Sequence, residues 1–125
     1  MIKLTKHFSK GEFCCNHCGK SGPLFGLEIL RTAQFMEKVR AFLGNKPITV
    51  NSGYRCPVWN KQVGGEPNSF HMRGMACDFT VQGMTPDEVQ DRLEQAGSPV
   101  AKGGMGRYAT FSHVDRRGVR ARWNG

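Results

Sequence analysis

The clearest hydrophobic pattern in the chain lies at residues 24–43, where apolar residues recur at steps of three and four with charged residues between them. This spacing predicts an amphipathic helix that packs one face on a core. Gly44 and Asn45 follow it and would end the helix. The expected core positions are Leu27, Leu30, Met36, Val39 and Leu43, with Phe35 and Phe42 beside them.

Three shorter segments also favour helix. Residues 9–13 could form a short helix, and residues 57–63 begin with a proline, which the first helical turn tolerates. Residues 85–97 open with Thr85 as the N-cap, then a proline and acidic residues in the first turn. We expect this last helix to cross between strands.

Strand patterns occur at residues 46–52, 75–81, 107–115 and 119–123, and we expect the last two to pair with each other. Side chains in a strand alternate between its two faces, so the sequence also predicts which residues face the core. In residues 75–81 the core set would be Met75, Cys77, Phe79 and Val81, with Ala76, Asp78 and Thr80 opposite, and in residues 107–115 a common face would hold Phe111, His113 and Asp115.

The whole chain of 125 residues has the size of one domain. We find no repeat, linker or low-complexity tract. Residues 1–23 are rich in glycine and polar residues, and we expect them to form a loop-rich N-terminal arm.

The charge of the chain is strongly positive, with 18 Lys and Arg against 10 Asp and Glu and a formal net charge of +8. Such a charge favours polyanions, whether nucleic acid, anionic lipid or an acidic cell-wall polymer. The basic residues are spread along the chain and do not alternate with aromatic residues, so we expect no nucleic-acid partner.

Residues 1–7 contain no apolar signal-peptide region, and no run approaches the roughly 18 apolar residues of a membrane span. We therefore expect a chain made in the cytoplasm without a signal peptide and without membrane insertion. If it acts outside the cytoplasm, another factor must release it.

The chain has five cysteines, and three of them crowd together with a histidine in the N-terminal arm. The odd number and the crowding favour reduced thiols or metal binding over a disulfide framework. Adjacent ligands fit a structural zinc site poorly, because such sites space their cysteines by two to four residues. A second, structural metal and unliganded thiols both stay open for Cys14, Cys15, His17 and Cys18.

His71 and Asp78 are separated by six residues that contain a glycine. A catalytic zinc ion takes three protein ligands and leaves one position open, and His113 on a neighbouring strand would complete such a set. The alternative is that His71 is an ordinary loop histidine and Asp78 a turn or edge residue. The spacing alone leaves the two readings open.

Four motifs follow one another in a recognisable order. Together they resemble the zinc D-Ala-D-Ala carboxypeptidase family of peptidoglycan metallopeptidases, which includes phage endolysins and shares its fold with the hedgehog signalling domain. The resemblance covers roughly residues 7–123. The motifs are Ser52-Gly53-Tyr54-Arg55, the run at residues 60–65, the run at residues 69–78, and His113-Val114-Asp115.

The resemblance implies a single α+β domain with a small, mostly antiparallel sheet and helices packed on one side. It also implies that His71, Asp78 and His113 bind one catalytic Zn²⁺. Arg55 would pair with a substrate carboxylate or polarise the scissile carbonyl, and Ser69 and Tyr54 would help to bind the substrate.

The chain departs from the family at one position. Many relatives place an acidic general base three residues before the last histidine, where this chain has Thr110. Threonine cannot serve as that base, so the proton acceptor must lie elsewhere. Asp115 is the first candidate, as base or as an acceptor that orients a ligand, and Glu66 is the second.

The resemblance implies a zinc peptidase that hydrolyses D-Ala-containing stem or cross-link peptides of bacterial peptidoglycan. It could be a D,D-carboxypeptidase, a D,D-endopeptidase or an L-alanyl-D-glutamate endopeptidase. We expect a monomeric phage or prophage lysis enzyme that reaches the cell wall after holin-mediated release. The alternative is a non-catalytic zinc-binding module of the same fold.

Overall fold

The computed structural model describes residues 2–125, which form a five-stranded sheet with helices around it. The helices are α1 (Lys10–Phe13), α2 (Leu27–Phe42), α3 (Pro57–Gln62) and α4 (Pro86–Leu93), with the 3-10 helices η1 (Pro23–Gly26) and η2 (Phe70–Arg73). The strands are β1 (Ile48–Ser52), β2 (Ala76–Val81), β3 (Gly104–Arg107), β4 (Ser112–Asp115) and β5 (Ala121–Asn124).

The strands follow the order β1-β2-β4-β3-β5 across the sheet. All neighbouring pairs are antiparallel except β3 and β5, which are parallel. The expectation of a single α+β domain with a mostly antiparallel sheet is therefore confirmed.

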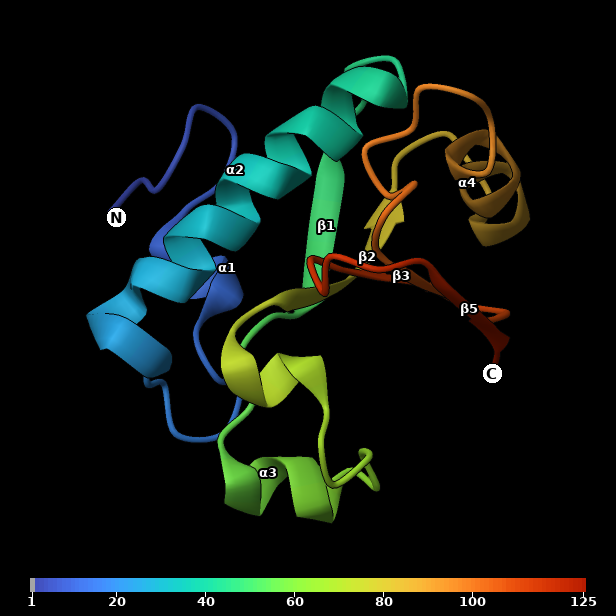
Figure 1. Ribbon diagram of the computed structural model, residues 1–125. Helices are drawn as coiled ribbons and strands as arrows, with labels where there is room; N and C mark the ends of the chain where they lie inside the picture. The colour runs from blue at the N-terminus through green and yellow to red at the C-terminus, as the bar shows by residue number, and fades with distance from the viewer. Residues whose placement is uncertain (1) are drawn as a thin grey trace.

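One face of the sheet carries the hydrophobic core. Cys77 and Phe79 of β2, Met105 of β3 and Val114 of β4 are fully buried in one cluster with apolar residues of α1, α2 and α4. Figure 1 shows α2 passing obliquely across the upper end of β1 and α4 beyond the other strands, while α3 and η2 lie past the end of the sheet. The alternation predicted for residues 75–81 is confirmed at Cys77 and Phe79, and it leaves Asp78 on the other face.

The long helix α2 begins three residues later than the sequence pattern predicts. Leu24 and Phe25 have φ values of 56° and 55° and belong to the turn of η1, so the helix starts at Leu27. Leu27 itself is 39% exposed. The buried positions of the helix are Ile29, Thr32, Ala33, Met36 and Val39. In the first turns, Ile29 is therefore buried in place of the expected Leu27 and Leu30.

The expected strand at residues 107–115 is too long: residues 112–115 form β4, whereas Arg107 ends β3 and a turn separates the two strands. The expected pairing of the last strand with it is also corrected, since β5 pairs with β3 and runs parallel to it. β3 was not predicted from the sequence, because glycines such as Gly104 and Gly106 are uncommon inside strands. Both glycines alternate with the buried Met105, and side chains from neighbouring strands occupy the space beside them.

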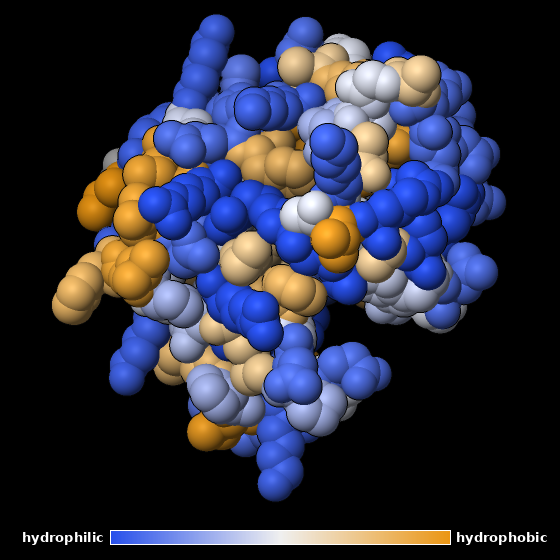
Figure 2. All heavy atoms as spheres, viewed as in Figure 1, coloured by the Kyte–Doolittle hydropathy of each residue, from blue (hydrophilic) through white to orange (hydrophobic). Residues whose placement is uncertain are grey.

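The face of the molecule in Figure 2 is largely hydrophilic, with small apolar groups on the side where α2 begins. Within residues 2–125, no helix combines the length and the apolar character needed to span a bilayer.

Candidate metal centre

The sheet register brings two of the three predicted metal ligands together. Asp78 of β2 lies directly opposite His113 of β4 in an antiparallel pair. Their neighbours Cys77 and Val114 point into the core. Because side chains alternate along each strand, Asp78 and His113 share the face opposite the core.

The third predicted ligand, His71, comes from η2, just before β2. The Ser69 hydroxyl caps η2 by accepting a hydrogen bond from the backbone N–H of His71 at 3.1 Å. Gly74 ends η2 with a φ of 70°, a conformation that favours glycine. The Thr32 hydroxyl of α2 donates to the Gly74 carbonyl at 2.6 Å and fixes this turn to the body of the domain.

The two imidazoles converge on one carboxylate oxygen. Nε2 of His71 lies 3.1 Å from Oδ1 of Asp78, and Nδ1 of His113 lies 2.8 Å from the same oxygen. One ligand atom from each of the three residues lies within 4.8 Å of the others, and all three side chains are buried. Two imidazole nitrogens and a carboxylate oxygen form the donor set of a mononuclear catalytic zinc site, so the residues present fit Zn²⁺.

The other nitrogen of each histidine has a fixed partner. Nδ1 of His71 lies 2.7 Å from the Gly53 carbonyl oxygen, to which it donates. Nε2 of His113 lies 2.9 Å from Oδ2 of Asp115. Such bonds set the tautomer and the ring orientation of metal-binding histidines, leaving Nε2 of His71 and Nδ1 of His113 for the metal.

Asp115 accepts more hydrogen bonds than its contact with His113. Its carboxylate also accepts from the backbone N–H of Gly104 at 3.1 Å and from Nε and Nη2 of Arg117, each at 2.8 Å. The side chain has no exposed surface. A carboxylate held in this way orients His113 and has no open side to take a proton from water, so the structure favours the orienting role over the role of base.

The glycines of β3 make room for these side chains. A Cβ atom at Gly104 would collide with the Asp115 carboxylate, and one at Gly106 would lie 2.5 Å from Nε1 of Trp123. Trp123 of β5 lies with its ring centroid 5.1 Å from that of His113. The glycine, methionine, glycine pattern of β3 thus serves the site on one face and the core on the other.

Arg55 lies beside the candidate ligands, at the end of the segment that leaves β1. Its Nη2 donates to Oδ2 of Asp78 at 3.1 Å, the oxygen that the histidines leave free. Its Nη1 donates to Oδ1 of the buried Asn60 at 3.2 Å, and Nε to the Ser52 hydroxyl at 3.3 Å. Asn60 in turn donates to the Glu66 carbonyl at 2.9 Å, which connects the loop before η2 to Arg55.

The charges of the centre support one another. Burial raises the pKa of Asp78, but the hydrogen bonds from His113 and His71 outweigh it and hold that pKa well below its usual value. Burial also raises the pKa of Asp115, but the hydrogen bonds with Arg117 and His113 outweigh burial and lower this pKa. Burial lowers the pKa of His71, whereas the two carboxylates beside His113 overcome the effect of burial and raise its pKa.

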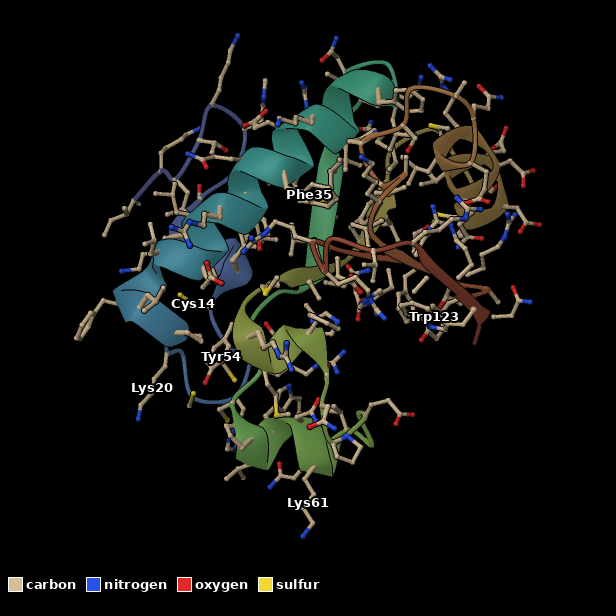
Figure 3. The ribbon with its side chains drawn as sticks, in the orientation of Figure 1. Cys14, Lys20, Phe35, Tyr54, Lys61 and Trp123 are labelled. Atoms are coloured by element: carbon tan, nitrogen blue, oxygen red, sulfur yellow. The ribbon has the colours of Figure 1, made fainter. Side chains whose placement is uncertain are left out.

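A cleft of about 700 Å³ opens over the metal centre. In Figure 2 the outline of the molecule is notched between α3 and the C-terminal strand, and Figure 3 shows Trp123 on the strand side of this notch. Apart from the candidate ligand Asp78, Glu66 is the carboxyl group among the described residues that line the cleft. The other lining side chains with a polar or aromatic group are Arg55, Ser69, Phe70, Tyr108, Phe111, Arg117, Trp123 and Asn124.

Tyr54 is the predicted substrate residue that the structure does not bring to this cleft. It lines a second hollow together with Cys14, and Figure 3 shows both residues away from Trp123. Tyr54 lies between Gly53 and Arg55 in an extended segment, where successive side chains point to opposite sides. Because Arg55 points to the metal centre, Tyr54 points away from it.

The structure also regroups the cysteine cluster. Cys15 and Cys18 lie together with Cys56, the residue before α3, and their sulfur atoms are within 4.8 Å of one another. Cys14 follows α1 in an extended conformation, so its side chain points the other way and packs against the core. His17 stacks on Trp59 instead, with ring centroids 5.3 Å apart.

Arg117 and Trp123 are site residues that sequence reasoning missed. Arg117 pairs with Asp115 and lies over the rings of Phe70 and Trp123, with its guanidinium carbon 4.5 and 5.0 Å from the ring centroids. A charged residue two positions after Asp115 was the available signal for Arg117. Trp123 gave none, because its position depends on the unexpected pairing of β5 with β3.

A centre of two histidines and one aspartate at the base of an open cleft, built on a small α+β domain, is an arrangement that zinc metallopeptidases use. Within this class, the chain belongs to the peptidase M15 family, whose model matches residues 6–115.

Two relatives share parts of the sequence. A zinc D-Ala-D-Ala carboxypeptidase of Streptomyces albus G is 49% identical over 44 residues, which are 35% of this chain and 17% of that protein. A protein of Haemophilus influenzae described as "Probable peptidoglycan L,D-endopeptidase MepK" is 36% identical over 90 residues, which are 66% of this chain and 46% of that protein. The chain thus spans less than half the length of either relative.

Proposed function

We propose that this chain is a zinc-dependent peptidase that hydrolyses peptide bonds in bacterial peptidoglycan. The observation that carries the proposal is the convergence of His71, Asp78 and His113 at the base of a cleft lined by Arg55 and Ser69. Further support comes from the two relatives, whose names describe a D-Ala-D-Ala carboxypeptidase and a peptidoglycan L,D-endopeptidase.

Zn²⁺ bound to this centre would supply the Lewis acid that peptide hydrolysis needs at neutral pH. Hydrogen bonds within the chain orient the three candidate ligands for the ion. The Gly53 carbonyl orients His71, Asp115 orients His113, and Arg55 holds the second oxygen of Asp78. Because these partners are already in place, the ligands need little rearrangement when the ion binds.

Arg55 and Arg117 are the cations that line the cleft. A stem peptide that ends in D-alanine presents a carboxylate, and a guanidinium can hold a carboxylate with two parallel hydrogen bonds. One N–H group of Arg55 donates to Asp78, and the N–H groups that remain could bind the substrate carboxylate. The Ser69 hydroxyl accepts from the His71 N–H and keeps its own proton for a substrate oxygen.

The proton acceptor in this proposal is Glu66. It is exposed in the loop before η2, it lines the cleft, and Asn60 fixes the backbone of its loop through the Glu66 carbonyl. Asp115 is fully buried and saturated with hydrogen bonds, which leaves the acceptor role to Glu66. A general base contributes typically about 10²–10⁴-fold to such a reaction.

The bond that is cut belongs to the same proposal. The two relatives carry names for different peptide bonds, so we propose cleavage next to a D-alanine of a stem or cross-link peptide, with an L-alanyl-D-glutamate bond as the alternative target. The formal net charge of +8 would keep the enzyme near an anionic cell wall. A lysis role in a phage or prophage, with holin-mediated release, stays a prediction.

The decisive experiment measures peptides released from purified peptidoglycan by mass spectrometry. We expect release with zinc, loss of release after chelation, and recovery when zinc is added back. Asp78→Asn should lose both the bound metal and the release, whereas Asp87→Asn, an exposed carboxyl outside the cleft, should keep both. Absent release from a folded, zinc-loaded protein would support the non-catalytic zinc module instead.

A further inference from the structure

Three sulfur atoms from two distant segments meet on the N-terminal side of the molecule. Cys15 and Cys18 belong to the turn after α1, and Cys56 is the N-cap residue of α3. Their sulfur atoms lie within 4.8 Å of one another. Cys15 is buried, Cys56 half-buried and Cys18 exposed. Protein atoms therefore cover one side of the sulfur group, and solvent reaches the other side at Cys18.

The turn between Cys15 and Cys18 presents both sulfur atoms to the same side. It is closed by a hydrogen bond from the Gly19 N–H to the Cys15 carbonyl and by one from the Cys15 N–H to the Lys20 carbonyl, both 2.9 Å. Gly19 has a φ of 72°, which allows the chain to reverse directly after Cys18. Two residues between two cysteines is one of the spacings found in zinc sites.

Backbone N–H groups point at these sulfur atoms. The N–H of Cys56 donates to the Cys15 sulfur and the N–H of Trp59 to the Cys56 sulfur, both at 3.4 Å. N–H donors stabilise a thiolate, which is the form of cysteine that binds metal.

Contacts that do not involve sulfur hold the two segments together. The Tyr54 N–H donates to the Phe13 carbonyl at 2.8 Å, and the Asn16 side chain donates to the Asn51 carbonyl at 2.9 Å. Gly53 lies so close to Phe13 that a Cβ atom would come within 2.7 Å of its backbone. The packing of the arm against residues 51–56 therefore places the cysteines before any ion binds.

We propose that Cys15, Cys18 and Cys56 bind a structural zinc ion, separate from the His71, Asp78 and His113 centre. Three thiolates are soft ligands that select zinc over magnesium or calcium. They supply three of the four ligands of a tetrahedral zinc ion, and a solvent molecule on the open side at Cys18 would be the fourth, which distinguishes this site from structural zinc sites closed by four protein ligands. This ion would join the N-terminal arm to the start of α3. Since Cys56 directly follows Arg55, the ion would also fix the backbone that carries Arg55 beside Asp78.

The test compares metal content and sulfur ligation in four forms of the chain: wild type, Cys56→Ser, Cys18→Ser and Cys14→Ser. Ser at position 56 keeps an oxygen that can accept the Trp59 N–H, and Cys18 is exposed, so both variants should fold. Cys14 lies next to Cys15 but outside the sulfur group, which makes Cys14→Ser the matched control. Circular dichroism checks the fold of each variant.

Zinc per chain is measured after purification under reducing conditions and dialysis. Cys56→Ser and Cys18→Ser should each carry one equivalent less than wild type, and Cys14→Ser should carry the same amount as wild type. Replacement with Cd²⁺ or Co²⁺ should give a sulfur-to-metal charge-transfer band in wild type and Cys14→Ser that is lost in the other two variants. The His71, Asp78 and His113 centre has no sulfur and cannot give this band, so the result does not depend on peptidase activity.

Two results would overturn the proposal. One is equal zinc content in Cys56→Ser and Cys14→Ser, with no charge-transfer band in the wild type. The other is a disulfide between two of the three cysteines that persists through purification under reducing conditions, seen as the corresponding loss of mass and of titratable thiols. The wild-type Cd²⁺ titration decides the question even if a cysteine variant fails to fold.

Discussion

Nε2 of His113 lies 2.9 Å from Oδ2 of Asp115, a carboxylate that has no exposed surface and that also binds both ends of the Arg117 guanidinium fork. This contact bears on two roles that the sequence leaves open for Asp115, that of general base and that of an acceptor that orients a metal ligand. An exposed carboxylate could take a proton from water, whereas this one is enclosed by its hydrogen-bond donors, and we propose that it holds the imidazole in place.

Asp115→Asn should therefore weaken metal binding more than it slows the reaction. The amide keeps the size of the carboxylate but loses the charge that orients His113, and loss of such a partner typically costs about 10–100-fold in metal affinity. Competition with a chromogenic chelator measures this affinity. At saturating zinc, kcat should recover most of its wild-type value. Unchanged zinc affinity with kcat reduced by about 10²-fold or more would return Asp115 to the role of base.

Arg55→Lys tests the guanidinium fork. Lysine keeps the positive charge but cannot donate to Asp78, Asn60 and Ser52 together. Hydrogen bonds to charged groups contribute about 1.5–3 kcal/mol each, so kcat/KM should fall by roughly 10–100-fold while zinc content is kept. The control is Arg31→Lys on α2, an exposed arginine that pairs with its helix neighbour and should leave kcat/KM unchanged.

Glu66→Gln tests the proposed proton acceptor. The amide cannot accept a proton, so kcat should fall by about 10²–10⁴-fold with zinc content and unfolding free energy unchanged, because the side chain is exposed. Asp87→Asn provides an exposed carboxyl outside the cleft for comparison. A variant that turns over at the wild-type rate would show that the proton leaves by another route.

Local periodicity predicted the part of the site that depends on β2. In a strand, the side-chain period is two, so the buried Cys77 and Phe79 determine that Asp78 points away from the core. No tertiary information was needed for that step. The partner of Asp78 required more, since only the register of β2 with β4 places His113 directly opposite.

Other parts of the site could not be predicted because their cause lies in distant residues. The glycines of β3 resemble a loop until the Asp115 and Trp123 side chains are seen beside them. Likewise, the sequence grouped the cysteines by closeness along the chain. The fold instead joins Cys15 and Cys18 to Cys56, which approaches because the arm packs on the segment after β1.

The metal-free protein should lose stability in acid. The pKa values of Asp78 and Asp115 are lowered in the fold, so their contribution is complete above the unfolded value of about 4 and is lost as pH falls through the folded values. The raised pKa of His113 has the opposite dependence, but its loss begins only above about pH 6.5. In chelator, the urea concentration at the unfolding midpoint should therefore decrease as the pH is lowered from about 5 to about 2.

Asp115→Asn should reduce this pH dependence, because it removes one of the two carboxylates, whereas Asp87→Asn should not. Zinc-saturated protein should unfold at higher urea concentration at neutral pH, since an ion that binds only the folded state stabilises it. A midpoint in chelator that is the same at both pH values would contradict the proposed charge arrangement of the centre.

Gly53→Ala tests how the N-terminal arm is held. The backbone of Gly53 does not have a positive φ, so the effect is steric: the added Cβ would lie 2.7 Å from the Phe13 Cα and carbonyl oxygen. Forcing the arm away should cost roughly 1–3 kcal/mol of unfolding free energy, as overpacking does. It should also weaken Cd²⁺ binding at Cys15 and Cys56, because Tyr54 and the residues after it would separate from Phe13.

The matched control is Gly11→Ala in α1, where no atom lies within 4 Å of the added Cβ. Alanine is favoured over glycine in a helix by up to about 1 kcal/mol, so this variant should be as stable as the wild type or slightly more stable. Urea unfolding and the charge-transfer band compare the two variants directly. If Gly53→Ala matched Gly11→Ala in both, the close contact with Phe13 would not be what brings the cysteines together, and the arm would owe its position to Asn16 and the sulfur group itself.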